Sequence, residues 1–537
     1  MRFLIKLAIP LCLLLLSLSP AQDTDAQNLV GRLLLLAFEG EAAPLDRLAE
    51  FSPAGFLYYR SNVPSTEAAR TSTQALQEAA DYPLLFGIDQ EGGPFNTYRV
   101  DDATIFPGNM ALAATGDPAL AEAVGLAIGT ELAYAGFNLN FAPSVDVNSN
   151  PDNPIIGVRS FGADVETVSS FGAAYLAGLE ASGVAGVAKH FPGHGDTGVD
   201  SHLALPEVTG DRTRLNAVEL PPFKALIEAG VPGVMTAHVA FPAVEADVPA
   251  TLSGAALTNL LREELGFDGM VVTDFMDMKA IADNYGPGEA AVRSVVAGAD
   301  LVLLGADLAT QREVYAALQE AVVSGRLSGE RVREAVAATE AVASAYRPTW
   351  SAAPDYAAHR TLAAEVATRG ATLLWNEGAL PLLAGETVAV IAPQPSLFGE
   401  PPHLGEVLST YHEGVSVVAV SEDPSADEIA QALAAAEGAD KVVLGSYRWL
   451  GEFEAGLGSL HDALLATGKP LVVVTLGNPD DLRFLGTDAD AYLAVYGFRE
   501  ANLQGAAQVL AGQHVPTGKL PVNAGEQYPL GAGMETF

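Results

Sequence analysis

The sequence predicts an α/β fold in which a (β/α)8 TIM-type barrel is followed by a smaller parallel α/β sandwich domain. Eight short apolar runs occur before residue 346, and alanine-rich helical stretches separate most of them. Strands and helices that alternate on this scale are typical of a parallel sheet surrounded by helices. The 537 residues suffice for a barrel, which alone takes about 250, and for a second domain.

The first 21 residues resemble a secretory signal peptide. Arg2 and Lys6 precede an apolar run over residues 7–18, and the small residues that fit a cleavage site follow at 19–21. The run is shorter than the roughly 20 residues of a membrane-spanning helix. We therefore predict a secreted or periplasmic protein whose mature form has no membrane span.

The only cysteine, Cys12, lies inside this segment, so the mature protein is predicted to lack disulfides, cysteine nucleophiles and thiolate metal sites. A lipid anchor on Cys12 is the alternative, but Leu11 before it is not the small residue usual at such a site. The net charge of −38 argues against nucleic acid or an anionic membrane as partner, because both need a basic surface. We interpret the acidity as a well-solvated surface.

The predicted catalytic barrel spans residues 28–346. Its helices include 118–134, 165–181 and 257–265, and polar residues follow several of its strands, namely Asp89, Lys189, His190, His238 and Asp274. Barrel active sites form where the strands end, so these residues are candidates for one site. The predicted strands are 33–38, 55–59, 84–88, 138–142, 185–188, 233–236, 270–273 and 301–304.

A proline-containing segment, 347–361, is the predicted linker to a C-terminal α/β sandwich over residues 362–537. No nucleotide-binding glycine fingerprint or phosphate loop follows any strand of that domain. We therefore predict no cofactor. The strands expected there are 388–392, 415–420, 441–445, 471–476 and 491–496, with helices such as 426–436 between them.

The densest group of reactive side chains is the segment KHFPGHGDTGVDSH at residues 189–202. It holds three histidines, two aspartates and a lysine directly after the small apolar run 184–188. Its proline and glycines forbid a continuing helix or strand, so the segment is predicted to be a loop at the C-terminal end of a buried strand.

This pattern resembles the β-N-acetylhexosaminidase branch of glycoside hydrolase family 3, in its two-domain secreted form. The resemblance is strong over residues 28–345 and weaker beyond. It implies a barrel active site and cleavage of glycosides with retention of configuration. Further matches in the same order are IDQEGG at 88–93, FP at 106–107, NFAPSVD at 140–146, RSFG at 159–162 and VTDFMDM at 272–278.

The resemblance implies that Asp274 is the catalytic nucleophile, since a retaining glycosidase needs a carboxylate to attack the anomeric carbon. Asp274 ends an apolar run, and the alternative is that it caps the following helix. The acid and base of this branch is a loop histidine, here His202. Asp200 would accept a hydrogen bond from its imidazole and raise its proton affinity.

Lys189, His190, Asp89 and Arg159 match positions that the family uses to bind substrate. Alternatively, Arg159 pairs only with a local acid, Asp152 or Asp164. His238 is ranked below them, since it is equally consistent with a hydrogen-bonded histidine beneath the site.

A metal site is the competing interpretation of the loop, because His190, His194, Asp196, Asp200 and His202 are all potential ligands. Pro192 and Gly193 between His190 and His194 leave no rigid helical face on which two ligands would converge, so we predict no metal. One departure from the family is Pro94, which stands where arginine usually follows Glu-Gly-Gly. The departure bears on the conformation of the loop after Asp89 and on the preference for groups beyond the cleaved sugar.

These observations lead to the hypothesis of an exo-acting β-N-acetylglucosaminidase that acts on amino-sugar oligosaccharides or muropeptides. The alternatives are a β-glucosidase or β-xylosidase using a second-domain acid such as Glu452 or Glu454, a phosphorylase, and a secreted sugar-binding protein without turnover. A histidine acid does not repel phosphate, which keeps phosphorolysis open. The sequence does not indicate the oligomeric state.

Overall fold

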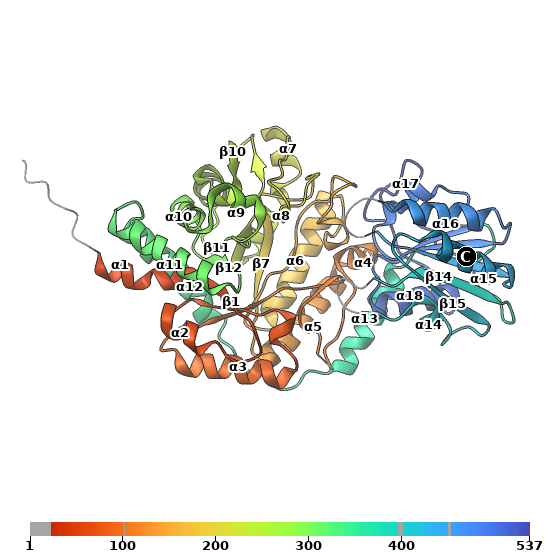
Figure 1. The fold of residues 1–537 in the computed structure, drawn as a ribbon, viewed down its shortest axis with the longest axis horizontal. Helices are drawn as coiled ribbons and strands as arrows, with labels where there is room; N and C mark the ends of the chain where they lie inside the picture. The colour runs from red at the N-terminus through yellow and green to blue at the C-terminus, as the bar shows by residue number, and fades with distance from the viewer. Residues whose placement is uncertain (1–22, 101, 396–400, 449–452) are drawn as a thin grey trace, which may run out of the picture.

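The computed structural model describes residues 23–100, 102–395, 401–448 and 453–537. The predicted signal peptide, with Cys12, lies outside the described residues. Two bodies follow one another along the chain, the barrel coloured red to green in Figure 1 and the second domain in cyan and blue. None of the described helices is long and apolar enough to cross a membrane.

The first body is the predicted barrel. Its parallel strands follow the order β11-β8-β7-β6-β3-β2-β1-β12, and a parallel bridge between Val272 and Leu301 joins the two ends. All eight predicted strands are confirmed. They are β1 (Leu34–Ala37), β2 (Gly55–Leu57), β3 (Leu85–Ile88), β6 (Leu139–Asn140), β7 (Ala185–Phe191), β8 (Gly233–Thr236), β11 (Met270–Val272) and β12 (Val302–Leu304).

Helices cover the outside of the barrel. The α-helices are α1 (Thr24–Leu29), α2 (Leu45–Phe51), α3 (Thr66–Ala79), α4 (Asn109–Ala114), α5 (Pro118–Ala135), α6 (Val165–Ala181), α7 (Arg212–Ala217), α8 (Leu220–Glu228), α9 (Lys279–Tyr285), α10 (Pro287–Ala297), α11 (Leu308–Val323) and α12 (Gly329–Ala345). A π-helix, η5 (Ala255–Glu264), replaces the α-helix expected at 257–265. Short 3-10 turns are η1 (Val30–Leu33), η2 (Arg60–Asn62), η3 (Gly157–Arg159) and η4 (Ala250–Leu252).

Helix α5 illustrates how the sequence sets these boundaries. The Asp117 side chain accepts a hydrogen bond from the Ala119 amide, and Pro118 occupies the first turn, where a missing N–H costs nothing. Gly136 ends the helix with φ of 94°, a conformation that favours glycine. The buried small residues of α5 pack against α6, so the two helices form a closely packed pair.

The second body is an α/β domain with a six-stranded sheet in the order β13-β18-β17-β16-β14-β15. The five predicted strands are confirmed, but the sheet is mixed because the unpredicted β13 runs antiparallel to β18. The strands are β13 (Thr372–Asn376), β14 (Val388–Pro393), β15 (Val415–Val420), β16 (Lys441–Ser446), β17 (Leu471–Thr475) and β18 (Ala491–Ala494). The helical elements are α14 (Leu404–Leu408), α15 (Ala426–Glu437), α16 (Ala455–Leu465), η6 (Pro479–Asp481), α17 (Leu482–Leu485) and α18 (Glu500–Leu510).

Helix α13 (Tyr356–Gly370) joins the two bodies and packs against α4 and α5 of the barrel and α18 of the second domain. It begins inside the expected linker, so only residues 347–355 lack a regular element. Met110, Ala111 and Val158 of the barrel belong to the hydrophobic core of the second domain. This shared core fixes the second domain against the barrel, and the two bodies lie side by side in Figure 1.

Candidate active site

A pocket of about 490 Å³ opens among the loops that follow the barrel strands. Its described lining residues all fall between Tyr59 and Leu303, so the barrel alone provides them. The lining includes six of the seven predicted site residues, Asp89, Arg159, Lys189, His190, His202 and Asp274. The seventh, Asp200, contacts His202.

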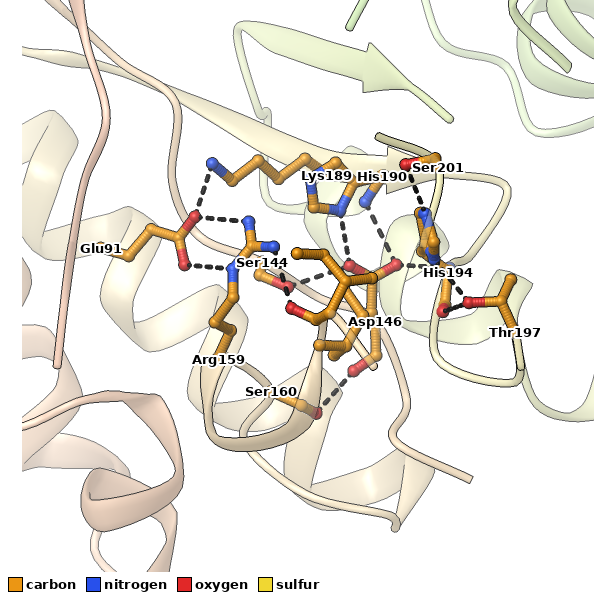
Figure 2. Close-up of polar contacts among 12 residues, drawn as sticks. Glu91, Ser144, Asp146, Arg159, Ser160, Lys189, His190, His194, Thr197 and Ser201 are labelled. Carbon is orange, nitrogen blue, oxygen red and sulfur yellow. Dashed lines mark hydrogen bonds and ion pairs between the residues drawn. The ribbon is translucent and has the colours of Figure 1, made fainter. Parts of the chain in front are cut away.

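One side of the pocket is a buried network of alternating charges. Lys189, near the end of β7, places Nζ 2.8 Å from Asp89 Oδ1 and 2.7 Å from Glu91 Oε1. Arg159, at the end of η3, donates to both oxygens of Glu91, from Nε at 3.1 Å and from Nη2 at 2.8 Å. Figure 2 shows the lysine and the arginine converging on Glu91. The pairing of Arg159 with Asp152 or Asp164, considered from the sequence, is wrong.

Glu91, for which no role was predicted from the sequence, lies at the centre of this network. Its side chain is 2% exposed, and burial alone would raise its pKa. The charges of Arg159 and Lys189 outweigh burial and lower the pKa of Glu91 to about 2. Glu91 is therefore ionised and holds both cations in place, which leaves their remaining N–H groups available to a sugar.

Asp146 is the second residue without a predicted role. Its Oδ2 lies 2.7 Å from His190 Nδ1, and its Oδ1 accepts hydrogen bonds from the backbone amides of His190 and His194. It is fully buried. One carboxylate thus orients the His190 ring and fixes the start of the loop, as Figure 2 shows.

His194 supports the loop from within. Its Nδ1 lies 2.8 Å from Thr197 Oγ1 and its Nε2 3.1 Å from Ser201 Oγ. Burial, with the neighbouring His190, lowers the pKa of His194 to about 4. His194 is therefore neutral at physiological pH and, through Ser201, connects the buried base of the loop to the segment that carries His202.

Asp200 and His202 form the predicted pair. His202 Nδ1 lies 2.8 Å from Asp200 Oδ1, which also accepts the His202 backbone N–H. The His202 side chain is 50% exposed, whereas that of Asp200 is 17% exposed. The hydrogen bond to Asp200 raises the pKa of His202 more than partial burial lowers it. A carboxylate on Nδ1 leaves Nε2 as the nitrogen that can exchange a proton with a ligand.

Asp274 lies two residues after the end of β11 at Val272 and is almost fully buried. Burial would raise its pKa, but the positive fields of His238 and His190, the Phe275 amide and His202 together lower it. The Phe275 N–H donates to Asp274 Oδ1 at 2.7 Å. Helix α9 is capped at Met278, so the helix-cap interpretation of Asp274 is wrong. An ionised, buried carboxylate facing a pocket is suited to nucleophilic attack.

His238 lies beneath this carboxylate with both ring nitrogens engaged. Its Nε2 donates to the Phe275 carbonyl at 2.8 Å, and its Nδ1 lies 2.8 Å from Thr251 Oγ1. It is fully buried, and burial lowers its pKa. The interpretation of His238 as a hydrogen-bonded histidine beneath the site is confirmed.

The potential metal ligands of the loop are occupied by other partners. Asp196 pairs with Arg214 at 3.0 Å, while His190 and His194 are held by Asp146 and by the Thr197 and Ser201 hydroxyls. Within the part of the chain that the structure describes, no three side chains of the ligand types come together to hold a metal.

The loop that carries Pro94 is held by the second domain. Arg499 donates to the carbonyls of Gly93 and Pro94, at 3.3 and 3.1 Å. The next residue, Phe95, lines the pocket and lies under the Arg159 guanidinium, whose carbon is 4.3 Å from the ring centroid. The proline therefore leaves the charge network intact and directs an aromatic ring against it.

A carboxylate from the second domain was the alternative acid. Glu454 is exposed, stands before the first turn of α16 and does not line the pocket. Glu452 lies outside the described residues. Of the two described carboxylate–histidine pairs at the pocket, Asp146–His190 is buried and Asp200–His202 has the exposed imidazole.

Comparison with known proteins gives matches along most of the chain. Residues 30–342 match the model of the glycosyl hydrolase family 3 N terminal domain, and residues 371–529 match that of the C-terminal domain. A β-N-acetylglucosaminidase structure from Paenibacillus sp. str. FPU-7 is similar at a TM-score of 0.88 and 37% identity, over 93% of this chain and 98% of that one.

Two curated relatives match over shorter stretches. Beta-hexosaminidase A of Pseudoalteromonas piscicida is 39% identical over 369 residues, which cover 62% of this chain and 61% of that protein. The beta-N-acetylglucosaminidase/beta-glucosidase of Cellulomonas fimi is 33% identical over 371 residues, which cover 65% of this chain and 64% of that protein. The chain thus spans less than two thirds of the length of these two relatives.

Proposed function

The chain belongs to glycosyl hydrolase family 3, and from this premise we propose that it is an exo-acting, retaining β-N-acetylglucosaminidase. The names of the similar proteins support the amino-sugar substrate. The observation that carries the proposal is the pairing of a buried, ionised Asp274 with the Asp200–His202 pair at one pocket.

In the first step, Asp274 attacks the anomeric carbon and the bond to the leaving oxygen breaks. His202, protonated on Nε2, gives its proton to that oxygen, so the aglycone departs as a neutral alcohol. The sugar remains as an ester of Asp274. In the second step, His202 takes a proton from water, the hydroxide attacks the anomeric carbon, and the Asp274 carboxylate is released.

Asp200 acts by positioning. It fixes the His202 ring through Nδ1 and stabilises the imidazolium form, which is the form that the first step needs. We assign Lys189, Arg159, His190 and Asp89 to the hydroxyl groups of the terminal sugar. Glu91 and Asp146 hold three of these four side chains, so the binding surface is rigid before substrate arrives.

A phosphorylase is the second candidate, and one observation favours it. Lys189, Arg159 and His190 all line the pocket, and the proposed acid is a histidine, so an anionic acceptor would not face a carboxylate acid there. Phosphate would then replace water in the second step and release a sugar 1-phosphate.

Purified protein tests both candidates with chromogenic glycosides. We expect rapid release from the β-N-acetylglucosaminide, far slower release from the β-glucoside, and free sugar as product in phosphate buffer. Equal rates on the two glycosides would contradict the assignment, and N-acetylglucosamine 1-phosphate as product would establish the phosphorylase instead.

We further propose that the protein is exported, on the basis of the N-terminal 21 residues alone. Amino-sugar oligosaccharides and muropeptides outside the cytoplasm would then be its substrates.

A further inference from the structure

A second pocket, of about 750 Å³, lies between the barrel and the second domain and is larger than the catalytic pocket of about 490 Å³. We call it the junction pocket. The barrel contributes Met110 of α4 and residues between 148 and 163, and the second domain contributes residues between 478 and 487 and between 522 and 529. Its volume falls in the range of about 300–1,000 Å³ that is typical of small-molecule sites.

An aromatic stack ends at the wall of the junction pocket. Tyr528 lines the pocket, and Trp375 covers one face of its ring, with centroids 5.2 Å apart and planes at 25°. Trp375 also stacks on Tyr492 at 5.3 Å, and its Nε1 donates to the Ala489 carbonyl. The stack therefore holds Tyr528 in place. A fixed aromatic face suits the C–H face of a sugar, because the ring face is negative and those hydrogens carry a slight positive charge.

Two buried polar side chains of the junction pocket each have an oxygen without a hydrogen bond. Asn148 is 8% exposed and Asp480 is 4% exposed. Neither Asn148 Oδ1 nor Asp480 Oδ2 accepts a hydrogen bond from the described residues, although Arg483 Nη1 lies 3.5 Å from the Asp480 oxygen. A buried oxygen without a donor is costly, and the hydroxyl groups of a ligand would supply donors to both.

Amide side chains make up much of the remaining polar lining. Asn478, Asn523 and Gln527 all line the pocket. Asn523 Oδ1 accepts a hydrogen bond from the Leu530 amide at 2.9 Å, which leaves its Nδ2 to donate. Amides offer both donors and acceptors, and each hydroxyl group of a sugar is likewise both.

The charges of the junction pocket disfavour an anionic ligand. Asp480 and Glu526 both line it, and the only cation among its described lining residues is Arg483. That arginine pairs with Asp152 at 2.8 Å and lies 3.5 Å from Asp480. The net charge of −38 also repels anions at long range. The indicated ligand is therefore polar and uncharged.

The junction pocket lies beside the active site and is separate from it. Ser149 lines the junction pocket, and its Oγ donates at 3.2 Å to Asp196, in the loop that carries His202. Six residues after Ser149, Ile155 lines the catalytic pocket. None of the described residues lines both pockets, so a substitution in one can be tested against the other.

We propose that the junction pocket is a non-catalytic binding site for a neutral oligosaccharide. One sugar ring lies against Tyr528, and Asn148 and Asp480 accept hydrogen bonds from its hydroxyl groups. The site retains the enzyme on carbohydrate chains beside the active site. This inference does not depend on which glycosidic bond the active site cleaves.

The test counts binding sites by isothermal titration calorimetry of the full chain with N,N′,N″-triacetylchitotriose. All proteins carry Asp274→Ala, so that the ligand is not cleaved. We expect this parent to bind two molecules, one in each pocket. Adding Tyr528→Ala should leave the first site unchanged and raise the Kd of the second about tenfold or more, the upper range for a lost ring contact. Adding Asn148→Ala should also weaken the second site only.

Tyr411→Ala is the matched control. Tyr411, like Tyr528, is a partly buried tyrosine that packs against the core of the second domain, but it does not line the junction pocket. The control should keep both sites. If Tyr528→Ala and Asn148→Ala have the same number and affinity of sites as Tyr411→Ala, the inference is overturned. If the catalytic pocket binds no triacetylchitotriose, the parent shows one site and Tyr528→Ala weakens it, so failure of the proposed function is distinguishable.

Asn148→Ala also separates ligand binding from a structural role. Because Asn148 Oδ1 has no hydrogen-bond partner in the free protein, loss of the amide should not lower the unfolding temperature. With Asp274 restored, kcat/KM on the small chromogenic N-acetylglucosaminide should match the wild type. A lower unfolding temperature with unchanged binding of triacetylchitotriose would show that Asn148 serves the fold and would overturn its assignment to the ligand.

Discussion

Substituting Glu91 by glutamine removes one charge from the centre of the buried network and keeps the side-chain shape. Glu91 is bound by both Arg159 and Lys189, and after the substitution only Asp89 remains to neutralise the two cations there. Breaking a buried ion pair from one side costs about 3–5 kcal/mol. We expect the lower part of this range, because Asp89 still contacts Lys189.

The assay is denaturant unfolding of the wild type and the variant, followed together with kcat/KM on the chromogenic N-acetylglucosaminide. Glu50→Gln is the matched control, because Glu50 also binds an arginine through both oxygens, in this case Arg312 at the surface. Solvent screens that pair, so its loss should move the unfolding transition far less.

The pH dependence gives a second check on Glu91. Its pKa is lowered from 4.5 to about 2, so its contribution to stability is present above pH 4.5 and is lost as the pH falls toward 2. Wild type and Glu91→Gln should therefore differ most above pH 4.5 and converge in acid. If Glu91→Gln matches Glu50→Gln in both stability and activity, the network does not hold Lys189 and Arg159 as we argue.

Four further predictions concern the chemistry and the N-terminus. Asp274→Ala should abolish turnover of all glycosides, whereas His202→Ala should slow natural disaccharides by ~10²-fold or more and accumulate the glycosyl-enzyme from an activated aryl glycoside, seen by mass spectrometry on Asp274. Asp200→Ala removes the hydrogen bond that raises the pKa of His202, so the alkaline limb of the pH profile of kcat/KM should move to lower pH. An alkaline limb at the wild-type pH would show that Asp200 does not tune His202. Exhaustive chelation should leave full activity, and loss restored by zinc would revive the metal interpretation. N-terminal sequencing of exported protein should begin near residue 22, and an uncleaved product would contradict the signal peptide.

The barrel was predictable because each strand is a short apolar run bounded by polar or glycine-containing segments, and every run became a strand. Strand β13 was not predicted because it follows α13 almost without a break, over Thr372–Asn376. Its antiparallel direction depends on pairing with β18, more than a hundred residues later. The local sequence pattern of a strand does not indicate which distant strand it will pair with.

In the candidate site too, features set by the local sequence were predictable and contacts between distant residues were not. Residues at strand ends were predictable as one group, since parallel strands bring their C-terminal ends to one face. Glu91 and Asp146 were missed because their partners lie 68 and 44 residues away in the chain. A usable signal was present, however: each is an acid inside an apolar or glycine-rich stretch, and a buried carboxylate needs a cation or several N–H donors.

The two proposed catalytic groups lie in opposite environments, and this difference supports the roles that we propose for them. Asp274 is buried, and neighbouring histidines and a backbone amide lower its pKa, so it is an anion at neutral pH. His202 is half exposed, and its hydrogen bond to Asp200 raises its pKa, which favours the protonated form. Because the first step needs an ionised nucleophile and a protonated acid at once, shifting the two pKa values in opposite directions widens the pH range in which both forms are present. Exposure of His202 also suits the second step, in which water must reach the imidazole while Asp274 carries the sugar.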